Sequence, residues 1–508
     1  MDEIQRRIRC PELRERIISA EAAAALIQDG MIVGTSGFTP SGYPKAIALA
    51  LAERVKQSGE RLKITVFTGA SVGDEIDGAL TETGIISRRS PYQTNNTLRK
   101  ALNTPGGVDY FDEHLILCPQ KLRYGFYGKM NVALVEACAI TEEGGIVPTT
   151  SVGNTATFIE CADLVLVELN TVQPASLEGF HDIYLLDDPP RRQPIPLTET
   201  GQRIGTTYIP CPLEKIAGIV ITDIPDSVRP LSEPNAGEVR MAQNIVDFLQ
   251  AEVKAGRLPD PLPPLQSGVG NVANAVLKGL KNSSFENLSF FSEVIQDAAF
   301  ELIDCGKFTT VSGTSLTPSA EGLKKFYENV DFYKQHILLR PTEISNHPEL
   351  ARRLGVIAMN TAIEADIYGQ VNSTHIMGTR MMNGVGGSGD FARSAYLSIF
   401  MTSSVAKDGD ISCIVPMCSH VDHTEHDVCV IVTEQGLADL RNKSPRERAL
   451  AIINNCSHPD YRPLLLDYYQ RALKENKPGA CHTPLILSEA LSWHDRFNKT
   501  GSMKRPQK

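Results

Sequence analysis

Short β-branched runs alternate with helical patterns of about ten to fifteen residues along the whole chain, and this alternation constrains the fold more than any other feature. In the first half such runs include Met31–Val33 and the segment "RLKITVFTGA", which reads as a strand ending at Gly69. In the second half they include "LSFFSE" and "ISCIVPM". Strands that are joined by helices lie parallel in a sheet covered by those helices. The sequence therefore predicts an α/β fold with mainly parallel sheets.

A break in this pattern suggests where the chain divides into domains. A chain of 508 residues is too long for one hydrophobic core, so two or three domains are expected. The segment Ile224–Gly237 is rich in Pro, Ser and Asn and reads as a connection, and an amphipathic helix is predicted over Glu238–Ala255. We predict an N-terminal domain over residues 1–228 and a C-terminal domain over residues 229–508. The tail after Trp493 is expected to be a short, solvated end.

The two halves share an order of signatures that suggests a duplication. A Ser-Gly pair precedes a helix at Ser36–Phe38 and again at Ser267–Val269, and each helix leads into a strand. Those strands lead to Ser71 in the first half and Glu293 in the second. Ligands of open α/β sheets bind beyond the carboxyl ends of the strands. We therefore expect two related open α/β domains, with Ser71 and Glu293 facing a shared cleft.

Charge and hydropathy exclude several classes of protein. The formal net charge of −10 argues against nucleic-acid binding, which would need a basic face. No window approaches the roughly 18 uninterrupted apolar residues of a membrane span, and the N-terminus has no apolar signal segment. The eleven cysteines include no CxxC pair, which favours reduced thiols over disulfides or a zinc site. A cytoplasmic enzyme with no nucleic-acid or membrane partner is expected.

Two glycine-rich loops in the second half are candidate binding elements. Asn383–Phe391 contains G-x-G-x-x-G, but no clean strand precedes it, so a nicotinamide-binding fingerprint is disfavoured. Gln266–Val276 is a glycine loop that opens a helix and aims backbone N–H groups at negative charge. Isolated turns are the structural alternative for glycine. Two such loops in one domain favour an anion or oxyanion site.

Three histidines in "SHVDHTEHD", at positions 420, 423 and 426, recur at every third residue with three acids nearby. Imidazole and carboxylate groups can both bind divalent metals. However, the segment links two strands and lacks the HExxH order. A hydrogen-bonded surface or interface loop is the favoured interpretation. The Walker pattern G-x-x-x-x-G-K-[ST] is absent.

Glu293 stands where the strand "LSFFSE" gives way to a helical pattern. The structural interpretation is strong, because acids near a helix N-terminus gain about 0.3–1 kcal/mol from the helix dipole. The chemical alternative is a nucleophilic carboxylate, which requires a bound electrophile and donors for the developing oxyanion. The glycine loops offer such donors, but spacing alone does not bring them together. Both interpretations stay open at this level.

Longer motifs across both halves resemble one family. In the second half they are "LQSGVGNVANAVLKGL", "SEVIQD", "ISNHPE", "MMNGVGGSGDFARSAYLSIF", "VPMCSHVDHTEHDV" and "VTEQGLADLR"; in the first half they are "SGFTPSGYPKA", "TGAS", "PYQTNNTLRK" and "GIVPTTSVGNTATF". Together, from about residue 15 to about residue 503, they closely resemble the acetyl-CoA hydrolase/transferase family, class I coenzyme A transferases of short-chain acyl-CoAs. Within that family the chain is most similar to succinyl-CoA:acetate CoA-transferases. The resemblance implies two related α/β halves and a homodimer.

The resemblance also assigns roles to residues. Glu293 matches the family's catalytic glutamate, which forms an acyl-glutamyl anhydride and then a glutamyl-CoA thioester. The implied CoA contacts are Gly268, Val269, Gly270, Asn271, Val272, Asn383, Gly387 and Lys407, with Lys407 meeting a CoA phosphate. Backbone amides near Val269 and at Gly387 would hold oxyanions, and Asn346 and Glu434 would orient Glu293. Ser71 and Thr94 would contact the acceptor carboxylate.

The expected function is therefore CoA transfer between an acyl-CoA and a carboxylate, with succinyl-CoA and acetate as the first candidates. No metal, NAD or other cofactor beyond the substrate coenzyme A is expected. One alternative is a short-chain acyl-CoA hydrolase that uses the same site. An alternative of another class is a catalytically silent module of similar fold that binds CoA or senses a sugar phosphate. The range of accepted acids is not readable from the sequence.

Overall fold

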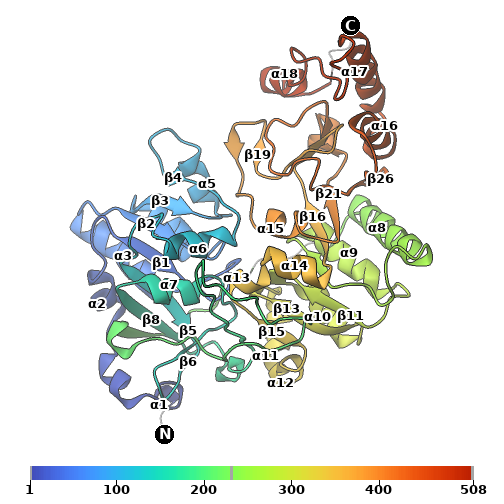
Figure 1. Cartoon of the computed structure of the whole chain (residues 1–508). Helices are drawn as coiled ribbons and strands as arrows, with labels where there is room; N and C mark the ends of the chain where they lie inside the picture. Colours follow the sequence, from blue (N-terminus) through green and yellow to red (C-terminus); the bar gives the residue numbers. More distant parts are fainter. Residues whose placement is uncertain (1–2, 229–232, 505–508) are drawn as a thin grey trace. The chain divides into compact units, whose positions relative to one another are not determined.

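The computed structural model describes residues 3–228 and 233–504 and has a mixed α/β architecture with mainly parallel sheets, as predicted (Figure 1). The chain forms two compact units. Unit 1 comprises Met1–Pro230 and Ser289–Leu354, and unit 2 comprises Leu231–Leu288 and Gly355–Lys508. The division into domains at residues 228 and 229 stays a prediction. Residues 229–232 of the expected connection lie outside the described residues.

A seven-stranded parallel sheet forms the larger part of unit 1. Its strands, in spatial order, are β4 (Asp109–Tyr110), β3 (Ile86–Ser90), β2 (Ile64–Phe67), β1 (Ile32–Thr35), β5 (Val132–Ala137), β8 (Leu164–Asn170) and β9 (Ile216–Thr222). Every residue of β5 is buried, as expected for a central parallel strand covered on both faces. Helix α3 (Ala46–Ser58) contributes Ile47 and Leu51 to the core against Val33 and Val66.

The strand order of this sheet reverses between β1 and β5. From β1 the chain proceeds outward through β2, β3 and β4, and it then returns to the other side of β1 as β5. Such a reversal leaves a crevice beyond the carboxyl ends of the two strands, where open α/β sheets bind ligands. The Ser-Gly segment at Ser36 follows the end of β1, and Ser71 follows the end of β2.

The later part of unit 1 contains the region around Glu293. Strands β11 (Leu288–Phe291), β13 (Phe308–Gly313) and β15 (Ile337–Leu339) are neighbours in a sheet, and β12 (Val294–Ile295) pairs in parallel with β14 (Ser315–Leu316). Helix α10 (Asp297–Asp304) begins four residues after Glu293. The expected helix start at Glu293 is therefore wrong, because β12 intervenes. Asp297 is the acid in the first turn of that helix.

Unit 2 has its own parallel strands, in the order β10 (Leu265–Ser267), β16 (Ile357–Thr361), β21 (Leu397–Met401) and β25 (Val430–Thr433), followed by antiparallel β26 (Gly436–Asp439). Helices α8 (Ala236–Lys254) and α9 (Asn271–Lys281) pack against each other. The order β10-β16-β21-β25 repeats the order β1-β5-β8-β9 of unit 1, as a duplication predicts. One expected strand, "ISCIVPM", is instead two short strands, β23 (Ile411–Ser412) and β24 (Ile414–Val415).

The C-terminal part of unit 2 is helical and well packed. Figure 1 shows α16 (Pro445–Cys456), α17 (Arg462–Glu475) and α18 (Ser492–Thr500) at the red end of the chain. Trp493 is buried in the same core as Tyr461, Leu465 and Tyr468. The expectation of a solvated end after Trp493 holds only in part as far as residue 504: Asp495, Lys499 and Lys504 are exposed, whereas His494 and Met503 are buried. No helix in the described ranges is long and apolar enough to cross a membrane.

Candidate active site

Glu293 lies at a bend between β11 and β12, and its main chain is fixed by the neighbouring strands of unit 1. Its carbonyl oxygen accepts hydrogen bonds from the backbone N–H groups of Thr314, at 2.7 Å, and Ser315, at 3.1 Å. A Cβ at Gly313 would lie 3.1 Å from the same carbonyl, so a side chain there would crowd it. The position of Glu293 is thus set by β-type pairing on both sides of the residue.

The side chain of Glu293 is partly buried and receives one neutral hydrogen-bond donor. Asn346 Nδ2 donates to Glu293 Oε1 at 2.7 Å. Burial raises the pKa of Glu293 to about 7, and the hydrogen bond from Asn346 opposes this rise. A carboxyl group that titrates near neutral pH can be either a proton carrier or a nucleophile, depending on its charge state.

Asn346 is itself held firmly. It is fully buried at the end of α13 (Thr342–Ser345), and its backbone N–H donates to Thr342 O at 2.9 Å. The Ser345 hydroxyl donates to Asn346 Oδ1 at 2.8 Å, which leaves the amide NH2 directed at Glu293. The structure therefore brings together two of the residues predicted from the sequence.

Segments from the first half of the chain support the Glu293 bend. Ser315 Oγ donates to Phe38 O at 2.6 Å, and Ser41 Oγ donates to Leu316 O at 2.7 Å. The backbone N–H of Leu316 donates to Thr150 O at 2.8 Å. The "SGFTPSG" and "VPTTSVGN" motifs thus hold β14, which in turn pairs with β12 next to Glu293.

Ser71 and Thr94, the expected acceptor contacts, lie beyond the ends of β2 and β3 in unit 1. Ser71 is fully buried, and within the described ranges its hydroxyl has no hydrogen-bond partner. Thr94 is half-buried directly before α5 (Asn96–Leu102), whose N-cap is Asn95. A buried hydroxyl with no partner costs free energy unless a ligand or water satisfies it. The Ser71 hydroxyl is therefore suited to bind a polar ligand atom.

Arg89 connects the loops that carry Ser71 and Thr94, and it was not among the site residues predicted from the sequence. It is fully buried and forms an ion pair with Asp77, with Nε–Oδ1 at 2.9 Å. Its Nη1 donates to Ser90 O at 2.6 Å and its Nη2 to Ala70 O at 3.2 Å. The guanidinium thus fixes the carbonyl next to Ser71 and the end of β3. No local signal in the sequence distinguishes Arg89 from its exposed neighbour Arg88.

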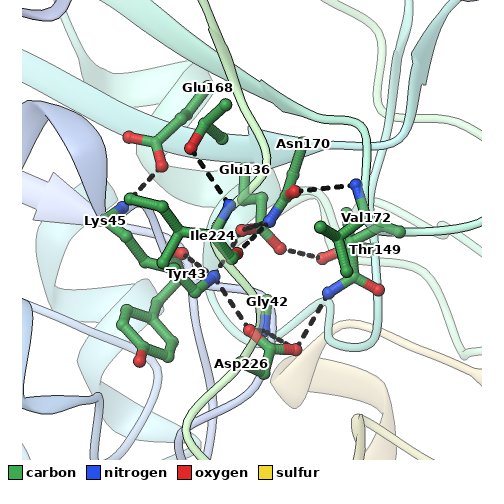
Figure 2. A network of polar contacts seen from close by, with 12 residues as sticks. Gly42, Tyr43, Lys45, Glu136, Thr149, Glu168, Asn170, Val172, Ile224 and Asp226 are labelled. Atoms are coloured by element: carbon green, nitrogen blue, oxygen red, sulfur yellow. Dashed lines mark hydrogen bonds and ion pairs between the residues drawn. The ribbon is translucent and has the colours of Figure 1, made fainter. Parts of the chain in front are cut away.

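A second buried charge cluster of unit 1, shown in Figure 2, centres on Lys45. Lys45 Nζ lies 2.5 Å from Glu136 Oε2 and 2.9 Å from Asp226 Oδ1, and all three side chains are essentially inaccessible. Burial lowers the pKa of Lys45, but Asp226 and Glu136 outweigh that effect and raise it overall. Burial raises the pKa of Glu136, and the ammonium of Lys45 opposes that rise.

The polar partners of this cluster come from distant parts of the chain. Asp226 accepts from Gly42 N at 3.2 Å, Thr150 Oγ1 at 2.8 Å and Gln173 Nε2 at 3.0 Å. Glu168 caps the start of α3 by accepting from the backbone N–H groups of Lys45, Ala46 and Ile47. The cluster therefore anchors the segment that ends in Asp226, next to the loops that support Glu293.

In unit 2 the expected CoA loop joins β10 to α9. Gly268 N donates to Met359 O at 2.9 Å, Val269 is 46% exposed, and Gly270 caps α9 with φ of +118°. Only glycine adopts that backbone conformation readily. Asn271 and Val272 occupy the first turn, where backbone N–H groups have no intrahelical partner. The predicted glycine loop that opens a helix is confirmed, and the structure adds strand β10 before it.

The second glycine loop precedes α15 (Ser388–Ala392). The elements before it, β19 (His375–Ile376) and β20 (Arg380–Met381), form an antiparallel hairpin rather than a parallel strand, so the structure gives no support to a dinucleotide fingerprint. Asn383 is half-buried and Gly387 is the N-cap of α15. Ser388 Oγ lies 3.0 Å from His423 Nε2, which links the loop to the histidine segment.

The three histidines occupy different environments. His423 is buried at 1% exposure and packs on the ring of Phe400, whereas the side chain of His426 is 84% exposed. Of the expected hydrogen-bonded surface or interface loop, the hydrogen bonding is confirmed for His423 but its exposure is not. Across residues 3–228 and 233–504, no group of three or more His, Cys, Asp or Glu side chains could hold a metal ion.

Lys407 and Glu434 complete the predicted set, both in unit 2. Lys407 is exposed, with its ammonium 4.9 Å from the ring centre of Phe497. Glu434 accepts from the Ser404 backbone N–H at 2.8 Å, from the Ser404 hydroxyl and from Gln435 Nε2 at 3.0 Å. Burial raises the pKa of Glu434, but these hydrogen bonds outweigh burial and lower it overall. The orienting role of Glu434 stays a prediction.

Two family models match most of the chain. The acetyl-CoA hydrolase/transferase N-terminal domain matches residues 1–221, and the C-terminal domain of the same family matches residues 322–469. A succinyl-CoA:acetate CoA-transferase of Clostridium kluyveri is 56% identical over 500 residues, which cover 98% of this chain and 92% of that protein. An acetyl-CoA hydrolase of Schizosaccharomyces pombe is 45% identical over 98% of both chains. Among solved structures, RipA from Yersinia pestis is similar in fold, with a TM-score of 0.71 at 22% identity over 90% of this chain and 98% of that one.

Proposed function

The chain belongs to the acetyl-CoA hydrolase/transferase family, and from this premise we propose that it transfers coenzyme A between succinyl-CoA and acetate, with Glu293 as the nucleophile. The 56% identity to a succinyl-CoA:acetate CoA-transferase over nearly the whole chain supports this substrate pair. The observation that carries the mechanism is the buried carboxylate of Glu293 with Asn346 as its amide donor.

In the first step, a carboxylate oxygen of Glu293 attacks the thioester carbonyl of succinyl-CoA. A C–O bond forms and the C–S bond breaks, which gives a succinyl-glutamyl anhydride and the CoA thiolate. The thiolate then attacks the glutamyl carbonyl. This step forms a glutamyl-CoA thioester and releases succinate. Covalent transfer of this kind divides a difficult exchange into two easier steps and conserves the thioester bond.

Acetate then runs the two steps in reverse. Its carboxylate attacks the glutamyl-CoA carbonyl and expels the CoA thiolate, which leaves an acetyl-glutamyl anhydride. The thiolate attacks the acetyl carbonyl, acetyl-CoA leaves, and the Glu293 carboxylate is regenerated. The Ser71 hydroxyl, buried and without a partner in the described ranges, would donate to the acetate carboxylate.

The environment of Glu293 serves this chemistry. Burial removes water from the carboxylate, which strengthens its nucleophilicity and protects the anhydride from hydrolysis. The attacking form is the ionised carboxylate, so a pKa near 7 keeps a useful fraction charged at neutral pH. Backbone N–H groups of the two glycine loops would hold the oxyanions, with Val269 and Gly387 as the proposed donors.

Hydrolysis of acyl-CoA is the second candidate, because relatives named as acetyl-CoA hydrolases are also similar over nearly the whole chain. In that reaction water rather than acetate would attack the glutamyl intermediate. CoA release should therefore be measured with and without acetate. Strict dependence on acetate supports transfer, and equal CoA release without acetate supports hydrolysis.

The decisive experiment is a covalent one. The protein is incubated with succinyl-CoA in the absence of acceptor, reduced with borohydride or digested directly, and analysed by mass spectrometry. After direct digestion, the peptide that contains Glu293 should carry the mass of coenzyme A less one water. After borohydride reduction, which cleaves the thioester and releases CoA, the same peptide should carry an alcohol in place of the Glu293 carboxyl group. Absence of that mass in an active preparation, or unchanged activity in Glu293→Ala, contradicts the mechanism.

We further propose that the reaction needs no metal or NAD, that the enzyme works in the cytoplasm, and that it forms a homodimer. Activity should survive dialysis against EDTA, and sedimentation should give twice the 55.5 kDa chain mass. Loss of activity that added zinc or magnesium restores would contradict the first of these proposals.

A further inference from the structure

Lys407 lies in a turn whose backbone conformation is unfavourable for two of the residues that form it. Lys407, Asp408 and Gly409 have φ values of +47°, +52° and +89° in succession. The left-handed region is unfavourable for residues that carry a Cβ, so two of these three positions are strained. Strain of this kind persists only where the surroundings determine the conformation, and it is concentrated at functional sites.

The contacts that hold the turn come from the C-terminal helices of unit 2. The Tyr461 hydroxyl, directly before α17, donates to Gly409 O at 2.8 Å. The backbone N–H of Met503, after α18, donates to Asp410 O at 2.7 Å. Both bonds hold the carbonyls that follow Lys407, so the C-terminal segment fixes the direction in which the lysine leaves the main chain.

Helix α18 is a firm support for this arrangement. His494 Nε2 lies 2.8 Å from Glu364 Oε2, and both side chains are almost fully buried. Trp493 packs on Tyr461 with ring centres 5.5 Å apart. The helix is thus joined to unit 2 by a buried polar pair and by an aromatic contact with the same tyrosine that holds the turn.

Phe497, one turn further along α18, meets the side chain of Lys407. The ammonium lies 4.9 Å from the ring centre, within the range of a cation–π interaction. Lys407 is exposed, and the contact that the structure gives its ammonium within residues 3–228 and 233–504 is the Phe497 ring. An ammonium group has three donors, so a ring on one side leaves donors free for an anion on the other.

We propose that Phe497 is a positioning residue for coenzyme A: it holds the Lys407 ammonium ready for a phosphate group of the ligand. This inference rests on the proposed function, because it takes CoA as the ligand. Phe497 lies beyond residue 469, where the match to the family's C-terminal domain ends. A mobile lysine side chain loses much rotamer entropy when it binds a phosphate. Because the Phe497 ring already restricts the Lys407 side chain before CoA binds, less entropy is lost on binding.

The test is equilibrium binding of free CoA, dephospho-CoA and pantetheine to the full-length protein. Phe497→Leu should raise the Kd for CoA about two- to fivefold, the range expected for one exposed cation–π contact. Phe497→Tyr keeps the aromatic face and should restore wild-type affinity. Pantetheine has neither the 3′-phosphate nor the diphosphate, so its affinity should not change in either variant.

Dephospho-CoA, which lacks only the 3′-phosphate, identifies the phosphate involved. If Phe497→Leu weakens CoA but not dephospho-CoA, Lys407 binds the 3′-phosphate; if it weakens both, Lys407 binds the diphosphate. A double variant with Lys407→Met should show no additional loss from Phe497→Leu. Phe126→Leu, an exposed aromatic in unit 1, is the matched control and should leave all three affinities unchanged.

Two results overturn the inference: unchanged CoA affinity in Phe497→Leu, or an equal loss of affinity for pantetheine. Binding is measured without turnover, so the result is separate from the chemistry at Glu293. If CoA binds normally to Phe497→Leu while Glu293 acquires CoA, the positioning role fails and the proposed function stands. If Glu293 never acquires CoA but Phe497→Leu shows the phosphate-dependent loss of affinity, the positioning role stands and the proposed function fails.

Discussion

At the scale of single residues, the chemistry depends on how Glu293 is solvated. Its carboxyl group has exchanged water for a partly buried site with one neutral donor, which explains a pKa near 7 in place of the usual 4.5. Such a site destabilises the ionised carboxylate in the resting protein. In the proposed mechanism, the same instability would make the carboxylate a better nucleophile when a thioester is bound.

Glu293→Gln should therefore stabilise the free protein, and more so at higher pH. The pKa of Glu293 is higher in the folded state than in the unfolded state. Below pH 4.5 Glu293 is protonated in both states, so its ionisation does not affect the free energy of unfolding. Between pH 4.5 and 7 the unfolded state ionises first, and wild-type stability falls as pH rises. The gain of Glu293→Gln should approach about 2–3 kcal/mol above pH 7. Urea unfolding at pH 5 and pH 8 measures it; a gain that is equal at both values contradicts the assigned pKa.

Asn346→Ala should lower kcat by about ten- to a hundredfold, the range for losing a hydrogen bond to a charged group. It should also move the acidic limb of the rate profile to higher pH, because the lost donor favoured the ionised carboxylate. Transfer rates between pH 5.5 and 9 test both effects. Asn329→Ala, an exposed asparagine of the same unit, should change neither. A loss of rate with an unmoved pH profile would mean that Asn346 acts only through structure.

Glu293→Asp is the complementary change, because it keeps the charge and shortens the reach by one methylene. Misplacing a reacting atom by about 1 Å can cost roughly a hundredfold in rate. The Glu293 main chain is fixed by Thr314 and Ser315 and cannot shift to compensate. Single-turnover transfer from succinyl-CoA should therefore slow by about that factor, and near-wild-type rates would show that the reach is not critical.

At the scale of secondary structure, the loops after β2 and β3 depend on one buried arginine. Arg89 bonds the carbonyls of Ala70 and Ser90 while its charge is balanced by Asp77. All of these acceptors are atoms of the protein itself, so they occupy the Arg89 guanidinium. Arg89 is therefore not available to bind a substrate carboxylate, although an arginine near Ser71 would suggest that role. Its role is to hold the turn that presents Ser71.

Arg89→Lys should raise the KM for acetate about tenfold, since a lysine keeps the charge but cannot reach all the acceptors in one plane. The KM for succinyl-CoA should change much less, because the proposed CoA loops belong to the other unit. Initial rates with each substrate varied in turn give the comparison. Arg257→Lys, an exposed arginine of unit 2, is the control. Equal rises in both KM values would indicate a general loss of structure.

At the scale of the whole molecule, buried charges join segments far apart in the sequence. The Lys45 cluster links residues near positions 42, 136, 150, 170 and 226, all within unit 1 (Figure 2). Removing one partner of a buried ion pair leaves an unbalanced charge, which typically costs about 3–5 kcal/mol.

Lys45→Met should therefore lower the free energy of unfolding by about that amount, seen as an earlier urea midpoint at pH 8. At pH 5 the loss should be smaller, because burial raises the pKa of Glu136 and the freed carboxylate can then take up a proton. Lys129→Met is the matched control: Lys129 pairs with Asp163 at the surface, and its midpoint should hardly move. A loss of the same size in both variants would contradict the role of the buried cluster.

The sequence alone determined the features that local chemistry encodes. Hydrophobic alternation gave the parallel α/β class, and Asn235 with Glu238 forms the capping box at the start of α8, close to the predicted helix. Gly270 is glycine because its φ of +118° requires it. The motif around Glu293 predicted a catalytic role that stays a prediction, and the helix expected there begins only at Asp297.

Only the tertiary structure decided which polar side chains are buried and what they contact. No local pattern marked Arg89 or Lys45 as buried, and His423 was expected in a hydrogen-bonded surface or interface loop, yet all three are buried. Their partners lie tens to hundreds of residues away in the chain, so no local pattern reveals them. Burial and long-range pairing depend on how strands and loops are brought together in space. For that physical reason, only the folded chain reveals the raised pKa of Glu293, the hydrogen bonds of Arg89 to two loops, and the contact between Lys407 and Phe497.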